Sequence, residues 1–161
     1  MRKILHFDSP RERYRCDAAV VWCYDNRFEL VLRKLLKRIG VLRYDPIRVA
    51  GGAKCLASPD NESEREFVLE QIRKSIRLHD TDRVVLMVHS DCGAYGGLAA
   101  FGGDAQAEWS HHRGELRRAA ACLRQALPQL SVVCYYVDFE GVWTADPEPA
   151  ATGSGFPSAN R

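Results

Sequence analysis

The stretch VVLMVHSDCGAYGG, from Val84 to Gly97, decides how we interpret this chain. Its first five residues are apolar without interruption, which is typical of a parallel strand buried on both faces. The run then ends on His89, and Cys92 lies in the glycine-rich turn that follows. We therefore expect a buried strand that delivers an imidazole and a thiol to one edge of a sheet.

Other segments alternate between strand and helix patterns. Short apolar runs at 18–23, 46–50 and 131–137 predict further strands, whereas apolar residues at helical spacing predict helices near 28–38, 60–78 and 107–126. Asp60 or Ser63 is expected to cap the second helix, and Gly40 to end the first. The inner side of the helix at 60–78 is predicted to carry Phe67, Leu69, Ile72 and Ile76. The pattern predicts a single-domain α/β fold: a mainly parallel sheet of about four to five strands flanked by helices.

Composition excludes several classes of protein. The 161 residues carry a net charge of +2 without a long run of one sign, which argues against a dedicated nucleic-acid binder. No apolar stretch is long enough for a membrane span, and the N-terminus lacks a convincing secretory signal. We therefore expect a cytoplasmic protein whose six cysteines are thiols or metal ligands rather than disulfides.

Polar residues follow three of the expected strands. Cys23, Asp25 and Arg27 come after the first, and His89 and Cys92 after the third. Gly51 and Gly52 follow the second. Because ligands in parallel α/β sheets gather beyond the carboxyl ends of the strands, these residues are predicted to share one crevice.

The residue types in this crevice favour zinc. Alternate residues of an extended segment point the same way, so Cys23 and Asp25 face together. Two thiolates and an imidazole, from Cys23, Cys92 and His89, are three ligands of a tetrahedral zinc site. The fourth position is open to water or to Asp25, and Arg27 can hold Asp25 away by an ion pair.

These motifs resemble a known family. C-x-D-x-R at Cys23 to Arg27, followed by H-S-x-C-G at His89 to Gly93, is similar to the zinc signature of the β-class carbonic anhydrases. The RVAGG segment at 48–52 resembles that family's Arg-Asn-Ala-Gly segment, with Val49 in place of asparagine. Val88 also stands where a glycine commonly precedes the His-Ser pair.

The resemblance implies both a site and a reaction. Cys23, His89 and Cys92 would hold Zn²⁺; Asp25 would be gate and proton acceptor, or fourth ligand in a closed form, with Arg27 as its partner. Members hydrate CO₂ reversibly to bicarbonate by a metal-bound hydroxide, and they form homodimers or larger homo-oligomers. The chain is then divided into an N-terminal arm (1–17), a zinc-binding α/β domain (18–145) and a flexible C-terminal tail (146–161).

Two alternative functions stay open. The same chemistry could act on carbonyl sulfide or carbon disulfide, or the chain could be a catalytically silent zinc-binding relative that acts through ligand binding or assembly. The remaining cysteines and histidines are interpreted as structural. We expect Cys16, Cys122 and Cys134 to be packing residues, Cys55 to lie nearer the crevice, His111 and His112 to be solvated, and His6 and His79 to lie on the surface.

Overall fold

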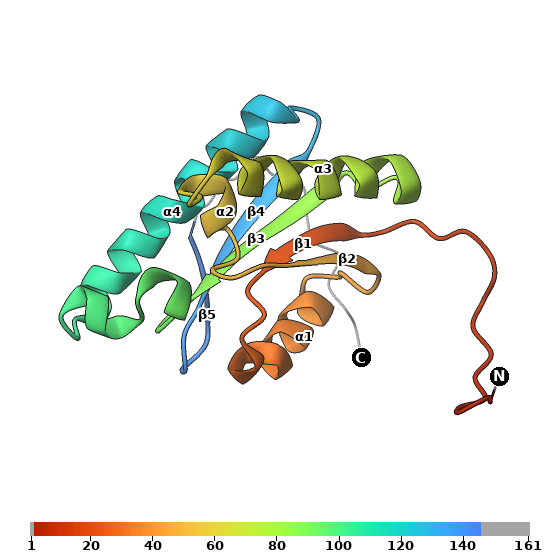
Figure 1. Ribbon diagram of the computed structural model, residues 1–161, viewed down its shortest axis with the longest axis horizontal. Helices are drawn as coiled ribbons and strands as arrows, with labels where there is room; N and C mark the ends of the chain where they lie inside the picture. Colours follow the sequence, from red (N-terminus) through yellow and green to blue (C-terminus); the bar gives the residue numbers. More distant parts are fainter. Residues whose placement is uncertain (1, 146–161) are drawn as a thin grey trace, which may run out of the picture.

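A five-stranded sheet forms the centre of the molecule. The computed structural model describes residues 2–145. The strands are β1 (Ala18–Trp22), β2 (Tyr44–Arg48), β3 (Arg83–His89), β4 (Ser131–Val137) and β5 (Val142–Thr144). Their order is β2-β1-β3-β4-β5; the first four are parallel, and β5 runs antiparallel to β4 (Figure 1). The predicted α/β fold with a mainly parallel sheet is confirmed.

Helices cover both faces of this sheet. The short α2 (Lys54–Ala57) and the long α3 (Glu62–His79) and α4 (Ala105–Ala126) lie on one face, and α1 (Glu29–Arg38) lies on the other (Figure 1). Two apolar clusters fill the layers between them. Strand residues therefore alternate between two cores, which is why the strands read as unbroken apolar runs.

Three short 3₁₀ helices connect the sheet to the larger helices. They are η1 (Asn26–Phe28), η2 (Gly93–Tyr95) and η3 (Leu98–Phe101). η1 follows β1 and η2 follows β3, so both lie at the carboxyl edge of the sheet. The polar residues singled out in the sequence fall on these two connections.

Two predicted boundaries and one predicted face were wrong. The second strand is 44–48 rather than 46–50, and it tolerates Pro46 because β2 is an edge strand. Asn61 caps α3 in place of Asp60 or Ser63, because its side chain accepts from the Glu64 N–H while the Glu64 carboxylate accepts from the Asp60 N–H.

The buried face of α3 also differs from the prediction. Phe67 is 58% exposed, and Val68 is buried instead. Leu69 and Ile72 are buried as expected, and Ile76 packs against the core. Because helix positions three and four apart share a face, a stripe through Val68, Leu69 and Ile72 turns Phe67 outward.

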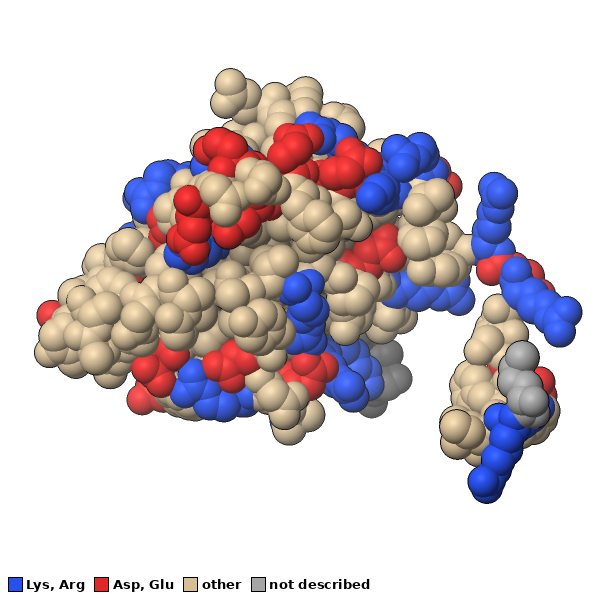
Figure 2. All heavy atoms as spheres, viewed as in Figure 1, with Lys and Arg blue, Asp and Glu red and all other residues tan. Residues whose placement is uncertain are grey.

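The distribution of charged side chains and the hydropathy of the helices follow what the composition of the sequence leads one to expect. Figure 2 shows acidic and basic side chains interspersed over the face that it presents. Among the described residues, no helix is long and apolar enough to span a membrane. No disulfide joins any of the six cysteines, all of which lie in the described part of the chain. The predicted tail at 146–161 lies outside the described residues.

Candidate metal centre

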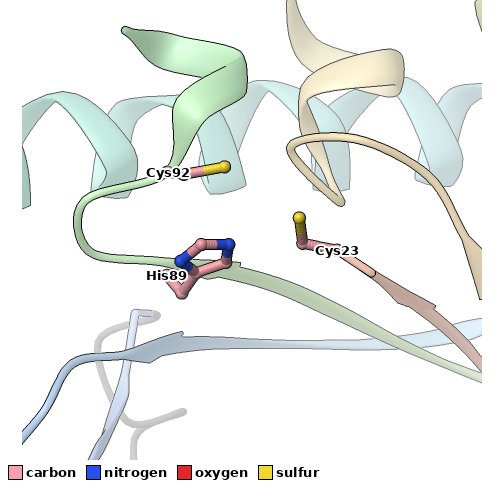
Figure 3. Close-up of side chains that lie close together, drawn as sticks. All are labelled: Cys23, His89 and Cys92. Atoms are coloured by element: carbon pink, nitrogen blue, oxygen red, sulfur yellow. The ribbon is translucent and has the colours of Figure 1, made fainter. Parts of the chain in front are cut away.

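Two adjacent parallel strands bring a histidine and two cysteines together. β1 pairs with β3, so Cys23, directly after β1, lies beside His89, the last residue of β3. Cys92 caps the start of η2. The two sulfurs and one ring nitrogen lie within 4.8 Å of one another (Figure 3). All three residues are buried, so this is a closed pocket of donors with the spacing of a metal site.

The surroundings of His89 leave one nitrogen for a metal. Its Nδ1 lies 2.8 Å from the Ser90 carbonyl oxygen, which can only accept, so Nδ1 carries the proton. Nε2 is buried and has no hydrogen-bond partner among the described residues. The ring packs against Trp22 and Phe28, with centroid distances of 5.4 and 4.8 Å. A buried, unpartnered nitrogen beside two thiols fits a coordinated cation, because such an atom is otherwise costly to desolvate.

Hydrogen bonding, chiefly from the neighbouring thiol, favours ionisation of one of the two cysteines. Hydrogen bonding from the Cys92 thiol, with contributions from the N–H groups of Asp25 and Gly51, lowers the pKa of Cys23 to about 4. The same pairing, together with burial, raises the pKa of the Cys92 thiol. One thiolate is therefore available near neutral pH, and a divalent cation would supply the charge that the second thiolate needs.

Gly52 is what allows the three loops to approach so closely. Its φ is +57°, and a Cβ there would lie 2.3 Å from the Met87 carbonyl oxygen and 3.1 Å from the Cys23 nitrogen. Only glycine fits both the backbone conformation and the space. The glycine pair after the second strand is thus part of the scaffold of the cysteine and histidine cluster.

A bridging arginine organises the carboxylates around this cluster. Arg27 donates to both oxygens of Asp25, with Nη2 2.7 Å from Oδ2, and its Nη1 lies 2.9 Å from Asp91 Oδ2. Asp25 Oδ2 is also 3.9 Å from His89 Nε2. The expected Asp25–Arg27 ion pair therefore exists, and it holds Asp25 at the border of the metal pocket rather than inside it.

Asp91 is a member of this group that the sequence prediction missed. Its backbone is left-handed, with φ of +51°. Its N–H donates to the buried Glu108 at 2.6 Å, and its Oδ1 accepts from the Leu98 N–H at 3.0 Å. The position of Asp91 between His89 and Cys92 was a signal, but nothing in the chain pattern showed that Arg27 would reach it.

The arginine keeps both aspartates ionised. Hydrogen bonds from Arg27 hold the pKa of Asp25 and the pKa of Asp91 below the usual aspartate range. The guanidinium also lies over two aromatic rings, 5.7 Å from the centroid of Phe28 and 5.5 Å from that of Phe139. Its orientation is therefore set by packing as well as by charge.

Some other interpretations of single residues were wrong. His112 is fully buried rather than solvated, whereas His111 is exposed. His79 is only partly exposed and lies 2.8 Å from Asp45 Oδ2. Cys55, by contrast, lies near the crevice as expected: it is buried outside the cysteine and histidine cluster, and its thiol donates to the Gly52 carbonyl oxygen at 3.1 Å.

Comparison with known proteins agrees with this geometry. A family model described as putative carbonic anhydrase matches residues 14–145. A protein of Rickettsia bellii (strain RML369-C), described as uncharacterized, is 22% identical over 148 residues, covering 88% of this chain and 90% of that protein.

Solved structures share the fold. The carbonic anhydrases of Glaciozyma antarctica and Streptococcus mutans each align with a TM-score of 0.56 at 18% identity, over 83% of this chain and 84% of theirs. The β-carbonic anhydrase isoform I of Trichomonas vaginalis aligns with a TM-score of 0.55 at 15% identity, over 87% of each chain.

Proposed function

Because this chain belongs to the putative carbonic anhydrase family, we propose that it hydrates CO₂ reversibly to bicarbonate at a zinc ion held by Cys23, His89 and Cys92. The observation that carries the proposal is the buried Nε2 of His89, which lacks a hydrogen-bond partner among the described residues, in a ring that has one nitrogen within 4.8 Å of both cysteine sulfurs. Bound zinc supplies Lewis-acid chemistry, lowering the pKa of a coordinated water toward neutrality.

Asp25 is the proposed proton acceptor and gate. Its carboxylate is ionised, because Arg27 lowers its pKa, and its Oδ2 is 3.9 Å from His89 Nε2. That oxygen would accept a hydrogen bond from a group bound beside His89 Nε2, while the ion pair with Arg27 holds the carboxylate out of the cluster. Release by Arg27 would let Asp25 close the site, so the ion pair favours the open form.

The proposed approach of a small substrate is through a cavity that adjoins the loops flanking the centre; Cys23, His89 and Cys92 do not themselves line it. It has a volume of about 750 Å³ and is lined in part by Tyr24, Val49, Cys55 and Ala94. Tyr24 follows Cys23 directly, and Ala94 lies two residues after Cys92. Val49, which replaces the asparagine of the β-class segment, makes this wall more apolar.

Assembly and location are also proposals. The N-terminal arm carries three apolar side chains that are more than three-quarters exposed, at Ile4, Leu5 and Phe7. We expect these side chains to pack on a second copy of the chain in a homodimer or larger homo-oligomer, which light scattering would report. A reducing cytoplasm suits the centre, because a disulfide between Cys23 and Cys92 would remove both sulfur ligands.

The test combines zinc analysis with stopped-flow CO₂ hydration on one preparation. We expect about one zinc ion at this centre per chain together with turnover. Asp25→Asn should keep that zinc and reduce turnover by about 10²-fold or more, which is the usual size of a general-base contribution. The matched control is Asp138→Asn, an aspartate after β4 that lies outside the cluster.

Other outcomes separate the alternatives. Turnover of carbonyl sulfide or carbon disulfide in place of CO₂ would change the substrate and keep the site. Zinc at the centre without turnover of any of the three between pH 7 and 9 would favour a silent binding protein. An absence of zinc at this centre would overturn the proposal as a whole.

A further inference from the structure

A second group of metal-ligand side chains lies at the opposite end of β1. Cys16 precedes β1 by two residues, Asp45 is the second residue of β2, and His79 ends α3. The Cys16 sulfur, an Asp45 oxygen and a His79 nitrogen lie within 4.8 Å of one another. We call these three residues the amino-edge cluster, because they lie where β1 and β2 begin.

The carboxylate of Asp45 is the centre of this cluster. His79 Nδ1 lies 3.0 and 2.8 Å from its two oxygens, and the Ser75 hydroxyl donates to Oδ2 at 2.6 Å. The Cys16 thiol also donates to this carboxylate, and burial and this contact raise its pKa to about 12. Three donors thus converge on one anion, two of them from α3 and one from the segment before β1.

The donor set is the one that zinc takes in proteins. A thiolate, an imidazole and a carboxylate bind zinc at about 2.0–2.3 Å, which places neighbouring ligand atoms about 3.3–3.8 Å apart. His79 Nδ1 and Asp45 Oδ2, now 2.8 Å apart, would have to separate by less than about 1 Å, and the Cys16 sulfur already lies within 4.8 Å of both ligand groups. Asp45 and His79 have side chains 21% and 27% exposed, so a cation can reach them from solvent.

We propose that the amino-edge cluster is a second zinc site, in which Cys16, Asp45 and His79 are the ligands and water takes the fourth position. With His79 neutral, binding displaces one proton, from the Cys16 thiol, and moves the ring proton from Nδ1 to Nε2. Zinc with one thiolate and one carboxylate is then formally neutral. Ser75 keeps its hydrogen bond to Asp45 and orients the ligating carboxylate.

Such a site would fasten the base of the N-terminal arm. The Cys16 N–H donates to the His79 carbonyl oxygen at 3.0 Å, and the Tyr14 ring stacks on the His79 ring at 4.4 Å. Arg15 pairs with Asp82 at 2.6 Å. A zinc ion would join this segment covalently to β2 and α3, which otherwise hold it through hydrogen bonds and stacking. The proposed role is structural and independent of the catalytic proposal.

The decisive measurement is zinc stoichiometry at equilibrium. The full chain, dialysed against zinc in excess over protein, should hold about two zinc ions, and Cys16→Ser should hold about one. Cys122→Ser is the matched control, because Cys122 is a partly exposed cysteine outside both clusters, and it should hold as many as the wild type. CO₂ hydration by Cys16→Ser should equal that of the wild type, whatever the fate of the first centre.

A structural readout guards against a misfolded variant. Zinc should slow tryptic cleavage after Arg11, Arg13 and Arg15 in the wild type, and it should leave cleavage of Cys16→Ser and His79→Gln unchanged. Equal zinc content in the wild type and Cys16→Ser would overturn the proposal, as would cleavage that zinc slows equally in the wild type and both variants. Loss of zinc from Cys92→Ser alone concerns the first centre and leaves this test intact.

Discussion

The two ends of β1 carry similar residues in opposite states. At the carboxyl end, Cys23 faces His89 and Cys92, and the buried Nε2 of His89 has no hydrogen-bond partner among the described residues. At the amino end, Cys16 and His79 both use their polar atoms on Asp45. In the first cluster the ring nitrogen is already without a partner and only the contact between the two thiols has to be given up, whereas the second cluster must break the hydrogen bonds of its histidine and its thiol before it can bind.

Arg27 accounts for much of this difference. At the carboxyl end it takes up Asp25 and Asp91, so no carboxylate satisfies the histidine. At the amino end Arg15 pairs with Asp82, and Asp45 contacts the Cys16 thiol and the His79 imidazole. An arginine that pairs with the nearby carboxylates thus leaves the histidine of the first cluster without a carboxylate partner, whereas the histidine of the second cluster has one. We therefore expect tighter zinc binding at the carboxyl end.

Removing one ligand from each end should give the largest contrast. Cys92→Ser is expected to lose zinc from the first centre and about 4 kcal/mol of stability, the contribution of a ligand present at about 1,000 times its dissociation constant. For a chain of this size that is a fall in Tm of about 8–16 °C. Cys16→Ser without zinc keeps a hydroxyl that can donate to Asp45, so its stability should change by no more than about 1 kcal/mol. Thermal unfolding followed by circular dichroism, with and without zinc, measures both.

The test depends on which of the two variants, Cys92→Ser or Cys16→Ser, loses more stability and zinc. A Cys92→Ser protein with wild-type zinc content and wild-type Tm would remove Cys92 from the ligand set. A Cys16→Ser protein that loses more stability than Cys92→Ser would reverse the comparison between the two ends.

Two glycines test whether the first centre depends on close backbone approach. Gly52 and Gly40 both have positive φ, so alanine costs about 1 kcal/mol or more at either position. At Gly52 the added Cβ also meets the Met87 carbonyl oxygen at 2.3 Å, whereas nothing lies within 4 Å at Gly40. We expect Gly52→Ala to lose about 3 kcal/mol, with reduced zinc content, and Gly40→Ala about 1 kcal/mol with normal zinc. Urea unfolding and metal analysis separate them; equal effects would show that backbone strain alone decides.

Much of the first centre could be predicted because its chemistry is local in sequence. Cys23, Asp25 and Arg27 lie within one short segment, and His89 and Cys92 within another. Parallel strand pairing then brings the two segments together, as the ends of a parallel sheet require. Fold class followed in the same way from apolar runs that alternate with helical periodicity.

Long-range polar contacts were not predictable in this way. Asp45 and His79 meet across 34 positions of the sequence, and no periodic pattern encodes that contact. Val68 replaces Phe67 on the buried face of α3. The rotation of the helix about its axis is set by its contacts with the core and not by which of the two side chains is larger. His112 was misassigned because its neighbours in sequence are polar, whereas its neighbours in space are aromatic rings.

His112 also tests whether an unpartnered buried imidazole is by itself a sign of metal binding. Like His89 it is fully buried, and neither ring nitrogen has a hydrogen-bond partner among the described residues. It lies among the rings of Tyr95, Phe101 and Tyr136, with Glu108 Oε1 3.5 Å from Nε2, and it belongs to no cluster of three metal ligands in the described part of the chain. The comparison with His89 predicts that it binds no metal.

The expected signature of His112 is a pH dependence of stability. Burial, with the nearby His111 and His89, lowers its pKa to about 4, although Glu115 opposes this. Between pH 6.5 and 4 the unfolded chain therefore binds more protons at this residue than the folded chain, so stability falls as pH falls. By pH 5 the loss is about 2 kcal/mol.

His112→Phe should keep zinc and wild-type stability at pH 7, because the phenyl ring fits among aromatic neighbours and no hydrogen bond is lost. Urea unfolding at pH 7 and pH 5 should then show a loss smaller by about 2 kcal/mol in the variant than in the wild type. An identical loss in both proteins would mean that His112 is not held neutral, and loss of zinc from the variant would make it part of a metal site after all.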